Sequence, residues 1–237
     1  IATMDSVQLS SLTTSQIGAL NTAQVLVMTP QDIVGLTTDQ IAALGTNQVG
    51  ALTTAQIQAL EVGDIDVMST AQVSAMDNTQ LAALTSDQVS HLTTDQIKAL
   101  TASQMGAIEP NDLAQFTTDQ IKTISVTQMG GMGTAQFAKL TSDQVAVMST
   151  AQISALGTAG IAALDSEAIA GLTSTQVSKL SSDQIVALST AQVSQLTTDA
   201  LSGVTATQMP HLETRDLAKL SPEQVAAIGT AAVAVLT

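Results

Sequence analysis

The sequence predicts an all-α solenoid, that is, a superhelix of very short helices with one helix in each eight-residue repeat. Three observations support this fold class. An eight-residue pattern runs unbroken from Asp5 to Leu236 through 29 octads. Each octad carries the residues that begin a helix. Two positions of every octad are apolar, at alternating spacings of three and five residues.

Each octad contains the signature of a helix N-terminus. Position 1, which starts at residue 5, is Ser, Thr, Asp, Asn or Gly in 26 of the 29 octads, and position 4 is Gln in 21. A position-1 hydroxyl can cap the first backbone N–H groups of a helix, and Gln three residues later can reach back to the cap, as in a capping box. Positions 8 and 5 form the hydrophobic staple across that cap. The segment 36–41, Leu-Thr-Thr-Asp-Gln-Ile, is one complete copy.

A cap in every octad limits each helix to the stretch from position 2 to position 7 or 8, less than two full turns. A strand would place positions 5 and 8 on opposite faces because their spacings are odd, and one long helix would wind the apolar stripe around itself. Helices this short are unstable alone, so positions 5 and 8 must pack against neighbouring coils. Small residues at positions 6 and 7 should let the coils approach closely. Two or three octads per turn suit most spacings of the polar side chains at position 7.

Nearly all large side chains are expected in a narrow core. The chain has only two aromatic residues, Phe116 and Phe137, and both occupy apolar positions that their neighbours must accommodate. The nine methionines also fall at positions 5 and 8, where they are expected to fill the core.

Composition excludes several classes of function. Of the 237 residues, 20 are acidic, six are basic and none is Cys, which gives a net charge of −14. Disulfides and thiolate metal sites are therefore impossible. Binding to nucleic acid or to an anionic membrane surface is not expected, because both need clustered Lys and Arg. No apolar run is long enough to predict insertion into a membrane.

Few residues qualify as ligands or catalysts. His91 and His211 both occupy position 7, with Met209 near the second, but no further ligand follows at a metal-binding spacing. Glu61, Asp64 and Asp66 form the densest acidic cluster, and a solvated surface cluster is favoured there over a calcium site. We therefore expect no catalytic, cofactor-binding or metal-binding residue, no cofactor and no enzyme activity.

Gln at position 4 is expected to be structural, as a capping-box partner that can also bond between coils. A polar stripe that binds a ligand is the less favoured interpretation. Gly160, Ala168, Ala200 and Ala232 replace this Gln, so single repeats should tolerate its loss.

Residues 1–237 are predicted to form a single repeat array, with 29 octads in 5–236. The array begins and ends within a repeat, and we expect it to be a fragment of a longer one. The predicted partners are neighbouring repeats and further copies of the chain end to end. A small-molecule ligand is not expected.

The pattern L-[ST]-T-x-Q-[IV]-x-A-L, as in the segment 92–100, resembles the octapeptide arrays of large bacterial surface or secreted proteins. These are often labelled adhesin-like or haem utilisation or adhesion proteins. The resemblance covers the whole chain and implies an extracellular or cell-surface location. It favours a non-catalytic stalk, spacer or filament-forming segment. The alternative is a binding solenoid for a peptide, glycan or haem, which predicts that residues departing from the repeat cluster on one face.

Overall fold

The computed structural model describes residues 4–236, whose regular secondary structure consists of short helices, with no strand among these residues. The chain divides into two compact units, unit 1 (Ile1–Phe116) and unit 2 (Thr117–Thr237), and each is described by itself. The octad pattern continues in the sequence across the boundary between them.

Each complete octad forms one short helix, as predicted. The helices of unit 1 are α1 (Ser6–Ser10), α2 (Thr14–Gly18), α3 (Thr22–Leu26), α4 (Pro30–Val34), α5 (Thr38–Ala42), α6 (Thr46–Gly50), α7 (Thr54–Ala59), α8 (Val62–Val67), α9 (Thr70–Ser74), α10 (Asn78–Ala82), α11 (Ser86–Ser90), α12 (Thr94–Ala99), α13 (Ala102–Ala107) and α14 (Pro110–Leu113). Those of unit 2 are α15 (Thr118–Thr123), α16 (Val126–Met129), α17 (Thr134–Phe137), α18 (Ser142–Val147), α19 (Thr150–Ala155), α20 (Gly157–Ala163), α21 (Ser166–Ile169), α22 (Ser174–Val177), α23 (Ser182–Ala187), α24 (Thr190–Gln195), α25 (Thr198–Ser202), the 3-10 helix η1 (Met209–His211), α26 (Thr214–Leu217), α27 (Pro222–Ala227) and α28 (Thr230–Val233).

The capping box sets where the helices begin. In α5, the Thr37 N–H donates to Gln40 Oε1 at 2.9 Å, and the Gln40 N–H donates to Thr37 Oγ1 at 3.3 Å. All helices but α20 and η1 start at position 2, and they end between positions 5 and 7, somewhat earlier than predicted. The helix has to stop there because the backbone extends at the next cap.

Two octads depart from this pattern for local reasons. In α20 the helix starts one residue early, since Gly157 adopts a φ of +64° that lets the chain leave the preceding helix without a side-chain cap. In η1, Pro210 has no N–H to offer to an α-helical turn, and the octad forms a 3-10 helix instead.

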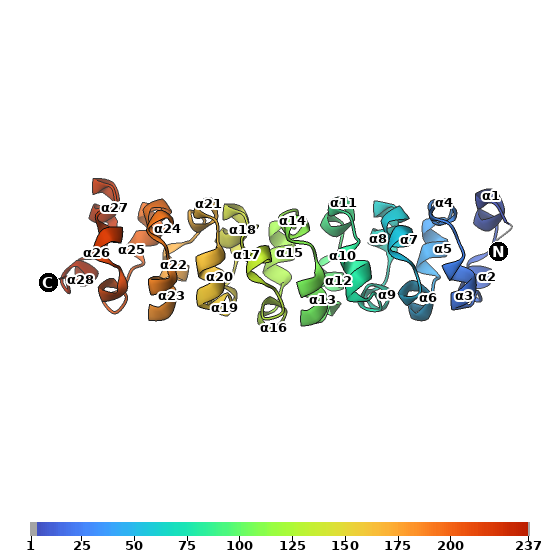
Figure 1. Ribbon diagram of the computed structural model, residues 1–237, viewed down its shortest axis with the longest axis horizontal. Coiled ribbons are helices and arrows are strands. Elements are labelled where there is room, and N and C mark those ends of the chain that lie inside the picture. Colours follow the sequence, from blue (N-terminus) through green and yellow to red (C-terminus); the bar gives the residue numbers. More distant parts are fainter. Residues whose placement is uncertain (1–3, 237) are drawn as a thin grey trace. The chain divides into compact units, whose positions relative to one another are not determined.

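Helices pack on the third helix further along the chain, so neighbouring coils are 24 residues apart. In Figure 1, α3, α6 and α9 follow one another along the lower edge of unit 1, and each contacts the next. Unit 2 repeats the arrangement, as in α17 with α20 and α20 with α23. This offset is the longer of the two suggested by the position-7 spacings.

Positions 5 and 8 line the core, as predicted. From Leu9 to Met209, no position-5 side chain is more than 4% exposed. Phe137 is buried because Gly160, in the octad that packs against it, has no side chain: a Cβ there would lie 3.0 Å from Phe137 Cδ2. Phe116 is also buried. The predicted accommodation of an aromatic ring is therefore confirmed at Phe137.

Each coil has two different faces toward its neighbours. Position 5 is covered by the octad three repeats later in the following coil. No such octad is described for Val225 and Val233, and these side chains are 47% and 43% exposed. Position 4 is covered by the coil before it. Gln56 is accordingly 1% exposed, whereas Gln16 in the second octad is exposed.

Small residues at position 7 permit the closest approaches between coils. A Cβ on Gly171 would lie 2.0 Å from the Ser142 carbonyl oxygen, and one on Gly203 would lie 2.1 Å from the Ser174 carbonyl oxygen. Glycine is therefore required at both positions because the backbone of the coil before fills the space of any side chain.

Candidate functional site

The most regular polar feature of the molecule is the position-4 glutamine. Gln56 illustrates its geometry: Oε1 accepts the Thr53 N–H at 2.7 Å, while Nε2 donates to the carbonyl oxygens of Val25 at 2.9 Å and Met28 at 2.7 Å. Those carbonyls belong to positions 5 and 8 of the octad four repeats earlier. One amide thus caps its own helix and also bonds to two carbonyls at the end of an octad in the preceding coil, where the Val25 carbonyl additionally accepts the Met28 N–H at 3.2 Å.

The same cross-coil amide bonds recur along both units, and we call them the glutamine ladder. Their donors in unit 1 are Gln40, Gln48, Gln56, Gln72, Gln80, Gln88, Gln96 and Gln104. In unit 2 they include Gln152, Gln176, Gln184, Gln192, Gln208 and Gln224. The structural interpretation of position 4 is confirmed, and the ladder accounts for why these buried side chains are amides.

Where position 4 is aspartate, the cross-coil bonds of the amide are lost and a different hydrogen bond can form. A carboxylate cannot donate to carbonyls, and Asp112 and Asp216 instead accept from hydroxyls of the adjacent coil, Ser86 Oγ and Thr190 Oγ1, each at 2.5 Å. Asp64 is 3% exposed and accepts only the Glu61 N–H, at 2.9 Å, among the described residues. Burial raises the pKa of Asp64. Its ionised form is therefore less stable in the folded chain than in water.

Replacing Asp64 by Gln is expected to raise the free energy of unfolding at pH 7 by about 1–2 kcal/mol, since the longer amide can cap Glu61 and reach the carbonyls of Ile33 and Leu36. The raised pKa means that the folded chain holds the Asp64 proton more tightly than the unfolded chain does. Stability from this group is full in acid and is lost as the pH rises through the ordinary aspartate range toward the raised value. The gain from D64Q should therefore shrink below that range.

Urea unfolding of the wild type and D64Q at several pH values measures this difference. Asp66→Asn is the matched control, because it removes the same charge from an exposed position of the same octad. Its effect should stay within about 0.5 kcal/mol. A gain for D64Q that did not exceed that of the control would contradict the assignment.

The predicted candidate ligands do not form a metal cluster. His91 lies in unit 1, exposed, with Nδ1 3.3 Å from Asp66 Oδ1 in the adjacent coil. His211 lies in unit 2 on η1, and Met209 beside it is fully buried in the core. Among residues 4–236, no group of three or more His, Cys, Asp or Glu side chains could hold a metal ion.

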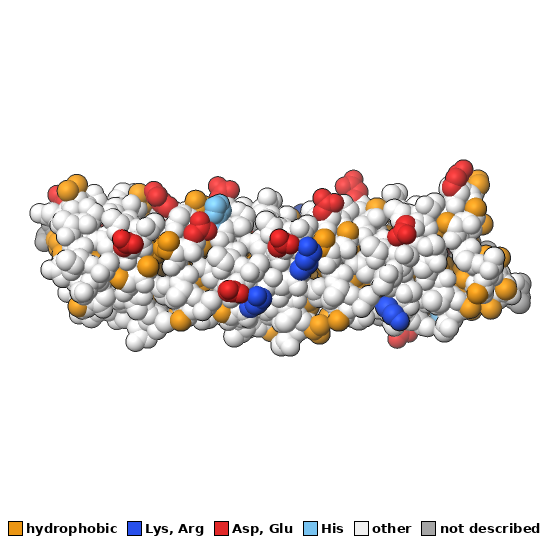
Figure 2. Space-filling view, turned by 180° about the vertical axis from the view of Figure 1, so that it is seen from behind, with side chains coloured by type: hydrophobic (Ala, Val, Ile, Leu, Met, Phe, Trp, Pro, Cys, Tyr) orange, Lys and Arg blue, Asp and Glu red, His pale blue; other side chains and the backbone are white. Residues whose placement is uncertain are grey.

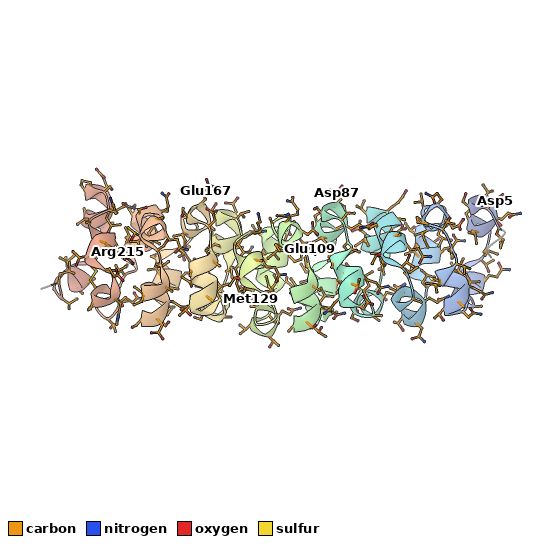
Figure 3. All side chains as sticks on the ribbon, viewed as in Figure 1. Asp5, Asp87, Glu109, Met129, Glu167 and Arg215 are labelled. Carbon is orange, nitrogen blue, oxygen red and sulfur yellow. The ribbon has the colours of Figure 1, made fainter. Side chains whose placement is uncertain are left out.

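Most acidic side chains are dispersed over the surface, but Asp64, Asp112 and Asp216 are buried, so the solvated surface cluster predicted for Glu61, Asp64 and Asp66 is wrong for Asp64. On the face shown in Figure 2, acidic side chains are scattered singly among side chains that are mostly neither charged nor hydrophobic. Asp87 and Glu167, at position 3 of their octads, lie at the outer edge of α11 and α21 (Figure 3). In this position they face the positive end of a short helix. Exposed ion pairs are few, and Lys98 with Asp95 at 2.9 Å is one of them.

Two surface clefts occupy equivalent places in the repeat, where the end of one octad meets the cap of the octad four repeats later. In unit 1 a cleft of about 420 Å³ is lined by Gly18, Leu20, Asn21, Thr22, Gly45, Thr46, Asn47 and Gln48. In unit 2 a cleft of about 300 Å³ includes Lys139, Asp165 and Glu167. Sequence reasoning missed both, because the residues that meet in each are more than 20 positions apart.

Comparison with protein families identifies the repeat. A family model described as the ALTTAQ repeat matches residues 27–62, 57–94, 105–142, 129–158, 137–174, 145–182, 161–198 and 209–237, which together make up well over half of the chain. The chain belongs to the ALTTAQ repeat family. Residues 51–56 spell the family's name in full. No curated protein matches the chain.

The ALTTAQ motif coincides with the contacts described above. Its Leu is the position-8 core residue, its first Thr is the helix cap and its Gln is the ladder donor, as in Leu52, Thr53 and Gln56. The ALTTAQ matches confirm a tandem octapeptide array, and the chain is a structural repeat module. No helix among the described residues is both long and apolar enough to cross a membrane.

Proposed function

We propose that the chain is a non-catalytic solenoid that serves as a stalk, spacer or filament-forming segment. The observation that carries this proposal is the glutamine ladder. A ladder Gln accepts the backbone N–H of its own cap and donates two hydrogen bonds to the octad four repeats earlier, as in Gln56 and Gln88. Because 21 of the 29 octads carry the same Gln donor and every octad has backbone carbonyls at positions 5 and 8, the stack can be lengthened one octad at a time without a new interface.

The recurring side chains of the octad, at positions 1, 4, 5 and 8, make their contacts within the array. Position 1 caps the helix, position 4 caps and bonds between coils, and positions 5 and 8 fill the core. What varies is the exposed surface at positions 2, 3, 6 and 7. A segment with these properties sets a distance between the parts of a protein that it connects.

We place this spacer in an extracellular or surface-exposed bacterial protein. Support comes from the resemblance of the pattern in the segment 92–100 to arrays in large adhesin-like or haem utilisation or adhesion proteins. Further copies end to end are proposed as partners, because position 4 of one coil and positions 5 and 8 of another are complementary throughout the array. The dispersed negative charge would keep such arrays soluble.

Small-angle X-ray scattering of the 237-residue chain tests the architecture. A compact globule of this length has a radius of gyration of about 18 Å. The proposed solenoid should give a value clearly above that, and a pair-distance distribution with a long tail. A value near that of the globule, in a sample shown to be monomeric and helical, would rule out the spacer.

A further inference from the structure

Two glycines from different coils line the cleft of unit 1. Gly45 stands at position 1, where most octads have Ser or Thr, and Gly18 stands at position 6 of an octad in the preceding coil. A Cβ on Gly45 would have only Gln48 Oε1 within 4 Å, at 3.5 Å, so the space beside it is open. The cleft has a volume of about 420 Å³, within the size range of small-molecule sites.

The residues that line this cleft carry uncharged polar groups, and some of these groups make no hydrogen bond to other described residues. Asn21 and Asn47 are two of only four asparagines in the chain. Asn21 Oδ1 accepts the Gln24 N–H at 2.9 Å, and no described residue bonds to its Nδ2 or to the Asn47 side chain. The hydroxyls of Thr22 and Thr46 lie on the same walls. The cleft therefore presents amides and hydroxyls that can donate and accept at once.

The lining also limits the charge of a ligand. No Asp, Glu, Lys, Arg or His lines the cleft, whereas the equivalent cleft of unit 2 carries Lys139, Asp165 and Glu167. Leu20 and the backbone of Gly18 and Gly45 also line the cleft. A ligand that suits these walls is neutral, carries several adjacent hydroxyls and has a small apolar face.

We propose that this cleft binds a neutral saccharide. Asparagine amides can pair with neighbouring sugar hydroxyls, which donate and accept in the same way, while the C–H face of a pyranose ring can lie on Leu20 and the glycine backbone. Gly18 and Gly45 thus lie in one cleft together with Asn21 and Asn47, two of the four asparagines of the chain. The proposal does not depend on the spacer function, which concerns the ladder.

Saturation-transfer NMR with the intact chain tests the cleft, because it detects binding with Kd values on the order of millimolar. The probes are the methyl glycosides of glucose, galactose and N-acetylglucosamine, and glucuronate and glycerol serve as charged and small controls. At least one glycoside should receive saturation, and neither control should. Gly45→Thr restores the usual cap and fills the cleft, and should weaken binding at least tenfold. Asn47→Ala should also weaken it.

Matched variants separate the cleft from general surface effects. Gly133→Thr makes the same change at a cap in unit 2, where nothing lies within 4 Å, and Asn111→Ala removes another position-3 asparagine. Both should bind as the wild type does. The proposal is overturned if no glycoside receives saturation, if glycerol receives as much, or if Gly45→Thr binds as tightly as Gly133→Thr.

Discussion

Replacing Gln56 by Glu is expected to lower the free energy of unfolding at pH 7 by about 3–5 kcal/mol. Glu keeps the oxygen that accepts the Thr53 N–H but loses the amide that donates to the Val25 and Met28 carbonyls, 2.9 and 2.7 Å away. A carboxylate oxygen would instead face two carbonyl oxygens at a position only 1% exposed. Urea unfolding followed by circular dichroism measures the change.

Gln16→Glu is the matched control for this prediction. Gln16 makes the same capping contacts with Thr13, at 2.8 and 3.2 Å, but it is exposed and has no cross-coil bond among the described residues. Its substitution should cost less than about 1 kcal/mol. The cost of Q56E should fall in acid, where a protonated Glu can again donate. Equal costs for the two variants would show that the cross-coil bonds contribute nothing.

Replacing Gly203 by Ala is expected to cost about 3 kcal/mol. The new Cβ would lie 2.1 Å from the carbonyl oxygen of Ser174 and 2.7 Å from its carbonyl carbon and Cα, all of which are backbone. The neighbouring coil would have to move, because no side-chain rotation can relieve the overlap. The midpoint of thermal unfolding, with hydrogen exchange of α22 and α25, reports the damage.

Gly63→Ala provides the contrasting substitution. Gly63 lies inside α8, and a Cβ there would meet only Thr38 Cγ2 at an ordinary 3.8 Å. The same chemical change should be neutral or stabilise by up to about 1 kcal/mol, because Ala favours a helix over Gly. A Gly203→Ala variant that was also neutral or stabilising would contradict the close approach of Gly203 to the backbone of Ser174.

The local structure of the octad could be predicted from the sequence because it depends on residues within eight positions of one another. The cap of Thr37, its box with Gln40 and the burial of Ile41 all follow from spacing. The exact helix ends could not be predicted in this way. In the octads of Gly157 and Pro210, single-residue backbone constraints changed the helix itself.

The candidate site was less accessible to sequence reasoning. The absence of a metal motif around His91 was evident, but its pairing with Asp66, 25 residues away, was not. The cleft beside Gly45 was also missed, because its two walls come from different coils. Gly18 and Gly45 are visible in the sequence, but that they meet in one cleft becomes apparent only when the coil offset is known.

The sequence by itself determined that each octad forms a short capped helix with two core residues, since caps, staples and periodicity act locally. Only the tertiary structure decided that coils lie three octads apart and that Gln40 Nε2 bonds to the carbonyl of Leu12, 28 residues earlier. With nearly identical octads, every possible offset buries similar side chains. The offset therefore depends on three-dimensional fit. Two glycines show this fit, because Gly160 leaves room for the Phe137 ring and Gly203 leaves room for the backbone of Ser174.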